Sequence, residues 1–302
     1  MLNNLLLIFI PMILGYLLLI PNPIWLKGIN TFISSLLYVI LFVIGISLGQ
    51  VQNLSSQIPF IGTTVIIFIV CILSCNILGL IAYDKISPLP PLTEQNIQQS
   101  HIGLIIQTSV LIGMVIIGFI LGWATRNVWQ LPSGSSNVVL ILMLFGVGIQ
   151  LRNSGIHMRE VFFNRRGLFT GLIFTITSLL GGIIAAYLLR LPITQGLTVA
   201  SGFGWYSLSS VVLNNAWGAI WGSIAFLNDL TRELISIFLI PLFMPKFRST
   251  AVGIPGATAI DCTLPIIQKA GGMEVVPFAI SFGFITNILP PILLSFFSSI
   301  PF

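Results

Sequence analysis

Long windows without a charged residue recur along the whole chain, and they restrict what it can fold into. A helix needs about 20 apolar residues to cross the hydrocarbon core of a bilayer. Windows of at least that length cover residues 1–26, 28–83, 95–125, 127–151, 167–189, 191–228 and 275–302. Charged residues are 6% of the 302 residues, whereas they are about a quarter of an ordinary soluble domain. We therefore predict an all-α polytopic membrane protein, embedded in the lipid bilayer as a single domain over 1–302.

The composition also argues against several kinds of partner. The basic residues stand singly between apolar blocks rather than in a patch, so we expect no nucleic-acid partner. The P-loop signature G-x-x-x-x-G-K-[ST] is absent, so we expect no nucleotide partner. The cysteines form no C-x-x-C motif, and the two histidines, His101 and His157, lie far apart. We therefore expect neither a metal site nor a cofactor.

The apolar windows divide into about eight transmembrane helices and two irregular segments. Full spans are expected near 4–21, 31–50, 59–83, 103–124, 137–151, 167–190, 225–244 and 275–299. The segments near 193–214 and 251–269 are expected to be re-entrant or broken, and glycines and prolines interrupt the second of them. The alternative is ten helices arranged in inverted repeats.

The positions of Lys and Arg orient these spans, because cytoplasmic loops of membrane proteins are enriched in both residues. The loop 152–166 contains four arginines and one acid, so we place it in the cytoplasm. Counting spans from this loop places both termini in the periplasm and leaves Arg126 as the one exception. Lys246 and Arg248 lie in the cytoplasm only if 193–214 enters the membrane and returns.

A weak internal repeat relates 1–83 to 103–190. Its clearest match pairs FVIGISL at 42–48 with FGVGIQL at 145–151, at an offset of 103 residues. Three spans per copy would invert the second copy relative to the first, which is the usual construction of secondary transporters. Chance similarity is the alternative, because short Gly, Ile and Leu strings recur easily in apolar sequence.

Charged residues are predicted inside the membrane in the second half of the chain. Only 12 residues separate Glu233 from Lys246, which is too short to span. A helix of about 20 residues that ends near position 244 must therefore begin near position 225. It carries Asn228, Asp229, Arg232 and Glu233 into the membrane. Asp229 and Arg232 are spaced to neutralise each other as a packing pair, which leaves Glu233 as the surplus carboxylate.

Asp261 is a second acid expected within the membrane. Pro265 lacks an N–H and would clash with the backbone carbonyl of Asp261 in a continuous helix. The backbone is therefore expected to open here, so that its carbonyls, the carboxylate and the hydroxyls of Thr258 and Thr263 converge. An intramembrane carboxylate indicates a functional site. The alternative is a protonated aspartic acid that caps a helix.

Small and hydroxylated residues gather in the uncharged window 191–228. They include Ser201, Gly202, Gly204, Trp205, Tyr206 and Ser207. Glycines allow backbones to approach closely, and the two aromatic rings offer their faces to a cation. Beside two buried acids, we expect this run to line a cavity that prefers a small cation. Packing of small residues between helices is the alternative.

Five segments add a further signal when they are taken together. They are Leu144–Asn153, Ser201–Ser207, Asn228–Leu234, Arg248–Ala251 and Gly256–Pro265. In this order they resemble the LysO family of bacterial L-lysine exporters, over essentially the whole chain. The resemblance implies a multi-pass transporter of the bacterial inner (cytoplasmic) membrane, not an enzyme, that exports L-lysine and toxic analogues such as thialysine. It also implies proton coupling and a critical role for Glu233 and Asp261. We expect proton-coupled antiport, in which these acids alternately bind the substrate ammonium and protons.

Two other functions stay open on the residues alone. A monovalent cation/proton antiporter of similar architecture would use the same acids to bind Na⁺. An intramembrane aspartyl protease would use Asp229 and Asp261, although the chain contains no Gly-x-Gly-Asp motif. A transport assay separates the first from lysine export, and incubation with a helical peptide tests the second.

Overall fold

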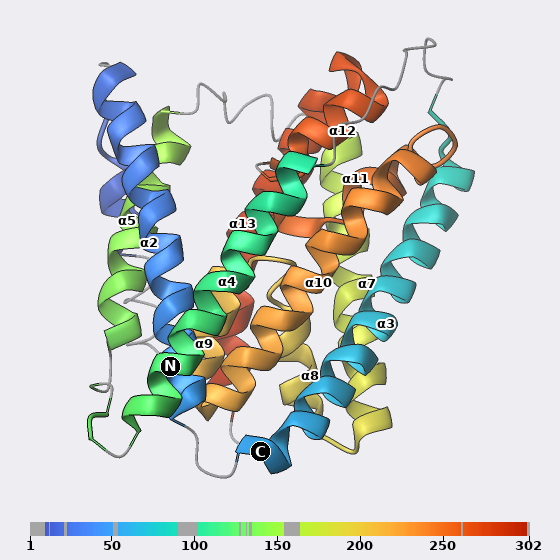
Figure 1. The fold of residues 1–302 in the computed structure, drawn as a ribbon. Coiled ribbons are helices and arrows are strands. Elements are labelled where there is room, and N and C mark those ends of the chain that lie inside the picture. Colours follow the sequence, from blue (N-terminus) through green and yellow to red (C-terminus); the bar gives the residue numbers. More distant parts are fainter. Residues whose placement is uncertain are drawn as a thin grey trace.

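The structure is a computed structural model that describes residues 10–11, 13–20, 23–50, 54–89, 102–126, 128–130, 132, 135–153, 164–260 and 262–300. Every regular element within these ranges is a helix, which confirms the all-α prediction (Figure 1). The first half contains α2 (Pro23–Gly49), α3 (Leu54–Ile86), α4 (Ile102–Thr125), α5 (Ser135–Asn153) and α7 (Arg165–Leu189). The helix α2 begins earlier than the expected span 31–50, because a proline is well suited to the first position of a helix.

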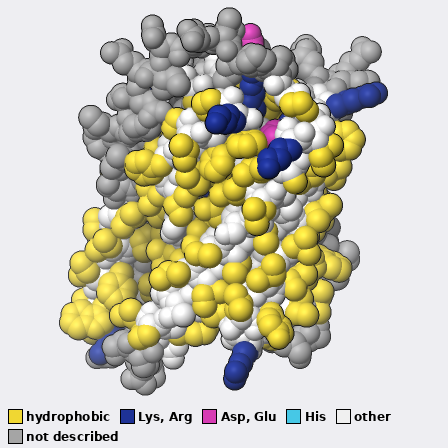
Figure 2. Space-filling view, turned by 90° about the vertical axis from the view of Figure 1, so that its right-hand side faces the viewer, with side chains coloured by type: hydrophobic (Ala, Val, Ile, Leu, Met, Phe, Trp, Pro, Cys, Tyr) yellow, Lys and Arg dark blue, Asp and Glu magenta, His cyan; other side chains and the backbone are white. Residues whose placement is uncertain are grey.

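Long apolar helices with exposed apolar side chains confirm the predicted membrane protein. Among the described residues, four helices are long and apolar enough to cross a bilayer, over Ile24–Gly49, Gln57–Ile86, Arg165–Leu189 and Val276–Ser298. Large apolar side chains such as Ile66, Ile116 and Leu180 are about half exposed or more. Figure 2 shows hydrophobic side chains over most of one face, with basic residues near its two ends. A patch of this extent is a liability in water, whereas lipid tails solvate it.

Glycines bring helices of the first half into backbone contact. A Cβ on Gly118 of α4 would overlap the backbone oxygen of Phe42 in α2. A Cβ on Gly181 of α7 would lie 2.5 Å from the Cα of Ile72 in α3. Small residues permit this approach in a bilayer, where helix association depends on close packing rather than on the hydrophobic effect.

Two of these glycine contacts are equivalent to each other. A Cβ on Gly15 would overlap the backbone oxygen of Phe145, just as a Cβ on Gly118 would overlap that of Phe42. The same offset of 103 residues separates the two glycines and the two phenylalanines. A repeat in which each copy packs against the other produces this pattern. The duplication itself stays a prediction.

The second half alternates broken and continuous helices. Its elements are α8 (Ile193–Ala200), α9 (Tyr206–Trp217), α10 (Ala219–Phe243), α11 (Arg248–Gly253), the 3-10 turn η1 (Gly256–Ile260), α12 (Leu264–Gly271), the 3-10 turn η2 (Met273–Val275) and α13 (Val276–Ser298). Figure 1 places α8 and α9 towards the lower end of the molecule, and α11 and α12 towards the upper end. The long helices α7, α10 and α13 connect the two ends.

The chain changes direction at each break. The helix α8 packs against α7, where Gly196 lies opposite Gly182, and α9 packs along α10, where Ser209 lies opposite Asp229. In Figure 1, α7 ends and α10 begins at the lower end, so the chain enters along α8 and returns along α9. Re-entry of these segments into the membrane stays a prediction.

The two breaks touch each other, and we call residues 201–205 and 254–260 the crossover. The backbone N–H of Ala257 donates to the backbone oxygen of Phe203 at 2.8 Å. Gly204 and Gly256 have positive φ angles of 94° and 70°. A Cβ on Gly256 would overlap the oxygen of Phe203, so this contact requires glycine.

Arg190 is a second exception to the distribution of basic residues that the sequence analysis used to orient the spans. It ends α7 with a left-handed φ of 55°, at the opposite end of that helix from Arg166. If the end that holds Arg166 faces the cytoplasm, Arg190 joins Arg126 as a second basic residue on the periplasmic side. The opposite end still carries more basic residues, so the expected orientation keeps its basis.

We predict that Lys246 and Val128 are accessible from opposite sides of the membrane. Both side chains are exposed, so a cysteine at either position is reachable by a maleimide. In a protein without Cys71, Cys75 and Cys262, an impermeant maleimide should label Val128→Cys in intact cells and Lys246→Cys only after permeabilisation. Labelling of both cysteines in intact cells would contradict the orientation.

Gly256→Ala is expected to destabilise the protein. The added Cβ meets the oxygen of Phe203 at a positive φ, and backbone strain of this kind costs about 1–3 kcal/mol. Thermal unfolding in detergent should therefore occur at a lower temperature than in the unaltered protein. Gly62→Ala is the matched control, because no atom lies within 4 Å of its Cβ position. Equal unfolding temperatures for the two variants would show that the crossover tolerates a side chain.

Candidate functional site

The carboxylate of Asp229 in α10 is bound tightly to the break between α8 and α9. The hydroxyl of Ser209 donates to Oδ2 at 2.5 Å. Oδ1 accepts from Nδ2 of Asn228 at 3.1 Å and from the N–H of Gly204 at 3.3 Å. A Cβ on Gly202 would overlap Oδ2, so glycine allows the carboxylate to approach the backbone. Asp229 is therefore a buried acid that holds the crossover against α10.

Arg232 does not form the expected ion pair with Asp229, although the two lie on adjacent turns of α10. Its guanidinium lies instead 5.4 Å from the centre of the Phe174 ring. Nη1 donates to the backbone oxygen of Ile254 at 3.4 Å. The i, i+3 spacing brings the two residues near each other, but the oxygens of Asp229 accept hydrogen bonds from Ser209, Asn228 and Gly204 instead.

Glu233 is buried at the next position of α10, with 2% of its surface exposed. The hydroxyl of Ser236 donates to the backbone oxygen of Glu233 at 2.6 Å. Asp261, the other acid expected to bind substrate and protons, lies outside the described residues. The structure therefore places Glu233 inside the protein, next to Arg232, which contacts the crossover through Ile254.

The structure describes the backbone on both sides of Asp261, and the helical conformation is interrupted between η1 and α12. The turn η1 ends before this position, and α12 begins after it with Pro265 in its first turn. The N–H and the hydroxyl of Thr263 both donate to the backbone oxygen of Thr258, at 3.0 and 2.9 Å. The hydroxyl of Thr258 donates to the backbone oxygen of residue 255 at 3.2 Å. The two threonines thus meet across the break and satisfy its backbone groups.

The other predicted residues of the first break make packing contacts. The hydroxyl of Ser201 donates to a backbone oxygen of α8 at 2.6 Å. Tyr206 is buried, and its ring packs edge to face on Phe226 with centroids 6.0 Å apart. Trp205 is half-buried against a large apolar cluster, and Ser207 is buried. The structure therefore brings the glycines of this run to the crossover, whereas its aromatic rings join the core.

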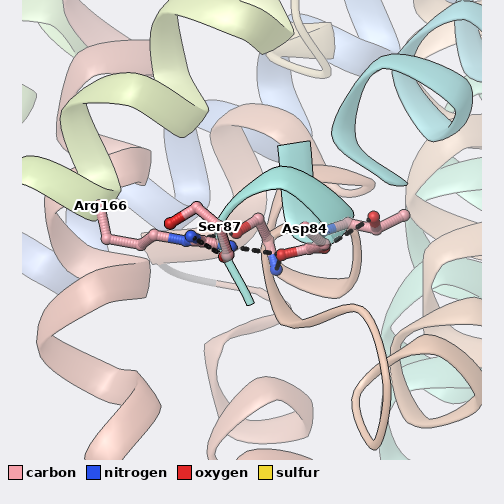
Figure 3. Close-up of polar contacts among 5 residues, drawn as sticks. Asp84, Ser87 and Arg166 are labelled. Atoms are coloured by element: carbon pink, nitrogen blue, oxygen red, sulfur yellow. Dashed lines mark hydrogen bonds and ion pairs between the residues drawn. The ribbon is translucent and has the colours of Figure 1, made fainter. Parts of the chain in front are cut away.

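A polar cluster that the sequence analysis missed attaches α11 to α3 and α7 (Figure 3). Asp84 of α3 is buried and pairs with Arg166 of α7 at 2.5 Å. The carboxylate accepts the N–H of Ser249 at 3.1 Å, and the N–H and hydroxyl of Thr250 at 2.9 and 3.0 Å. Arg166 also donates to the hydroxyl of Ser249 at 2.7 Å and to the backbone oxygen of Ser87. We call these residues the Asp84 cluster.

Only the scarcity of acids could have indicated the Asp84 cluster in advance. The chain contains 7 Asp and Glu residues, so each of them deserves an explanation. Asp84 stands beside Lys85 at the end of a predicted span, where both read as loop residues. Its partners lie 82 and 166 positions away, so no local spacing marks the cluster.

Asp229 and Arg232 of α10 contact the crossover, where two broken helices meet inside an apolar protein. Broken helices that meet near the middle of a membrane form the binding sites of many secondary transporters. Within the described residues, no three His, Cys, Asp or Glu side chains gather closely enough to hold a metal ion. The arrangement places buried charged groups where two broken helices meet, and such groups can bind a charged solute.

Comparison with known proteins identifies relatives over the whole chain. The family described as "Lysine exporter LysO" matches residues 112–298. A protein of Escherichia coli (strain K12) named "Lysine exporter LysO" is 44% identical over 99% of this chain and 100% of its own length. A "Putative lysine exporter" of Haemophilus influenzae is 63% identical over 63% of this chain and 98% of its own length. No solved structure matches the chain.

Asp84→Asn is expected to destabilise the protein strongly. The amide leaves Arg166 without its counter-charge and replaces one acceptor oxygen with a donor NH2 group. Breaking a buried ion pair costs about 3–5 kcal/mol, and the partial exposure of Arg166 favours the lower value. Membrane abundance and thermal unfolding should both decrease, whereas Lys85→Gln at the exposed neighbouring position should change neither. Unchanged stability of the Asp84 variant would exclude an anchoring role.

Proposed function

The chain belongs to the LysO family of lysine exporters, and from this premise we propose that it exports L-lysine by proton-coupled antiport. It is an integral membrane protein of amino-acid transport, and we assign it to the bacterial inner membrane. The observation that carries the mechanism is the buried carboxylate of Glu233, next to an arginine that contacts the crossover. Toxic analogues such as thialysine keep the charges of lysine, so they fall under the same proposal.

The two intramembrane acids, Glu233 and Asp261, hold different occupants in turn. In the inward-facing state they bind lysine through its ammonium charge. On the outward side protons replace the substrate, because one carboxylate cannot hold both cations. A periplasm that is more acidic than the cytosol then drives export, since binding of each ligand favours a different state. The burial of Glu233 supports this role, because intramembrane carboxylates mark ion and proton pathways.

The two broken segments provide access to this site from opposite sides. In this proposal 193–214 and 251–269 re-enter the membrane from its two faces, and about eight full spans surround them. The reversal of the chain at each break and the contact between the breaks support it. Asp229 acts as a positioning residue, because its hydrogen bonds hold the first break against α10. Thr258 and Thr263 are joined by hydrogen bonds across the interruption between η1 and α12, and Pro265 lies in the first turn of α12.

Glu233→Gln and Asp261→Asn are expected to abolish most lysine efflux at normal membrane abundance. Both substitutions keep the shape of the side chain and remove only the titratable charge. A hydrogen bond to a charged group contributes about 1.5–3 kcal/mol, which corresponds to roughly ten- to a hundredfold in binding. The measurement is efflux of labelled lysine from loaded proteoliposomes, with and without an acidic exterior.

Glu274→Gln is the matched control, because this acid is exposed in η2 and should not affect efflux. Full efflux by both neutral variants would exclude the carboxylate mechanism. Efflux that ignores the pH gradient would exclude proton coupling while leaving lysine export in place. Movement of Na⁺ without lysine would instead favour a monovalent cation/proton antiporter.

A further inference from the structure

Arg232 has much more hydrogen-bonding capacity than the structure uses. A guanidinium carries five N–H donors and no acceptor. Among the described residues, Nη1 reaches the backbone oxygen of Ile254 at 3.4 Å, and Nε has no partner. Only 1% of the surface of Arg232 is exposed, so bulk water does not replace the missing partners.

Asn228 shows the complementary deficit one helical turn away on α10. Its Nδ2 donates to Asp229, but its buried Oδ1 has no partner among the described residues. Residues four apart share one face of a helix, so Asn228 and Arg232, each with an unused polar atom, are neighbouring residues on α10. A Cβ on Gly204 would lie 3.3 Å from Cδ of Arg232, which places this face against the crossover.

The nearby acid Asp229 does not neutralise Arg232 through a direct ion pair. Its two oxygens accept hydrogen bonds from Ser209, Asn228 and Gly204 instead. The ring of Phe174 offers a cation–π contact, which stabilises a guanidinium without using its N–H groups. Buried polar groups without partners are costly and rare. An unused cationic donor beside an unused acceptor therefore indicates a ligand that carries both an anion and a donor.

We propose that Arg232 binds the α-carboxylate, and Asn228 the α-ammonium group, of the exported amino acid. This inference rests on the proposed function, because it concerns the same substrate. The planar guanidinium matches a carboxylate through two parallel hydrogen bonds, and such bonds to ionised groups are the strong ones. With the α-carbon end held in this way, Glu233 and Asp261 remain for the ε-ammonium group and for protons.

Arg232 is then a specificity-determining residue that separates amino acids from diamines. Lysinamide and 1,5-diaminopentane keep both amino groups of lysine but lack its carboxylate. Either compound would leave the guanidinium buried without an anion. A site built to bond a polar group rejects an analogue that lacks this group far more strongly than it rejects a change in apolar size.

The first experiment uses the unaltered protein in proteoliposomes that contain labelled lysine. External lysine, lysinamide and 1,5-diaminopentane compete for counterflow. We expect both analogues to compete at least about tenfold more weakly than lysine, because the carboxylate contact is lost. If lysinamide competes as strongly as lysine, the inference is overturned, and no result from substituted proteins can restore it.

The second experiment compares Arg232→Gln, Arg232→Lys and Asn228→Ala, with Arg165→Gln at an exposed arginine as the matched control. We expect Arg232→Gln to raise the KM for lysine and to lose the preference for lysine over lysinamide. Arg232→Lys should keep part of this preference, because it keeps the charge but not the planar fork. Asn228→Ala should weaken lysine and lysinamide together, since both carry the α-amino group.

The outcomes separate this inference from the proposed function. An unaltered protein that moves lysine, with an Arg232→Gln variant of unchanged preference, overturns the role of Arg232 alone. An unaltered protein that moves no lysine overturns the proposed function and this inference together. If Arg232→Gln does not reach the membrane, the competition measured on the unaltered protein and the preference of Arg232→Lys decide the question. A purely structural role for Arg232 would lower abundance in the variants without changing the ratio between lysine and lysinamide.

Discussion

One backbone hydrogen bond joins the two broken helices, from the N–H of Ala257 to the oxygen of Phe203 at 2.8 Å. In a bilayer, unwound backbone persists only where protein or enclosed water satisfies its polar groups. Here each break satisfies the other, and Asn287 of α13 donates to the backbone oxygen of Ala257 at 2.9 Å. The position at which the chain opens therefore depends on this contact, and α10 carries Asp229 and Arg232 beside it.

The buried polar residues differ in how many of their donors and acceptors have hydrogen-bond partners within the protein. Asp84 and Asp229 each receive several hydrogen bonds, and each attaches a broken segment to a long helix. Arg232 and Asn228 keep an unused donor and an unused acceptor at the crossover. Polar groups whose hydrogen bonds are all made stabilise the fold, because these bonds compensate the cost of burial. Polar groups that lack a partner raise the free energy of the folded protein, and a ligand that supplies the partner lowers it again. In our proposal, this difference separates residues that hold the site from residues that recognise the substrate.

The two broken units are built alike although they start from opposite ends of the molecule (Figure 1). Gly218 ends α9 with φ 88° and ψ 177°, and Gly272 ends α12 with φ 74° and ψ −178°. Each glycine leads into a long continuous helix, α10 or, after η2, α13. Two similar units that approach one point from opposite sides offer comparable routes to it from both ends, which is what transport by alternating access requires.

The sequence alone determined the class of the protein, because a scarcity of charges and long apolar windows leave a membrane as the one compatible solvent. It also indicated that Glu233 lies in the membrane, since the distance from Glu233 to Lys246 is shorter than a span. Only the tertiary structure decided that Phe203 meets Ala257, that Asp229 bonds Ser209 rather than Arg232, and that the Asp84 cluster exists. These contacts join segments that are 20 to 166 positions apart. Composition and spacing act locally along the chain, whereas such pairings depend on how whole helices pack in three dimensions.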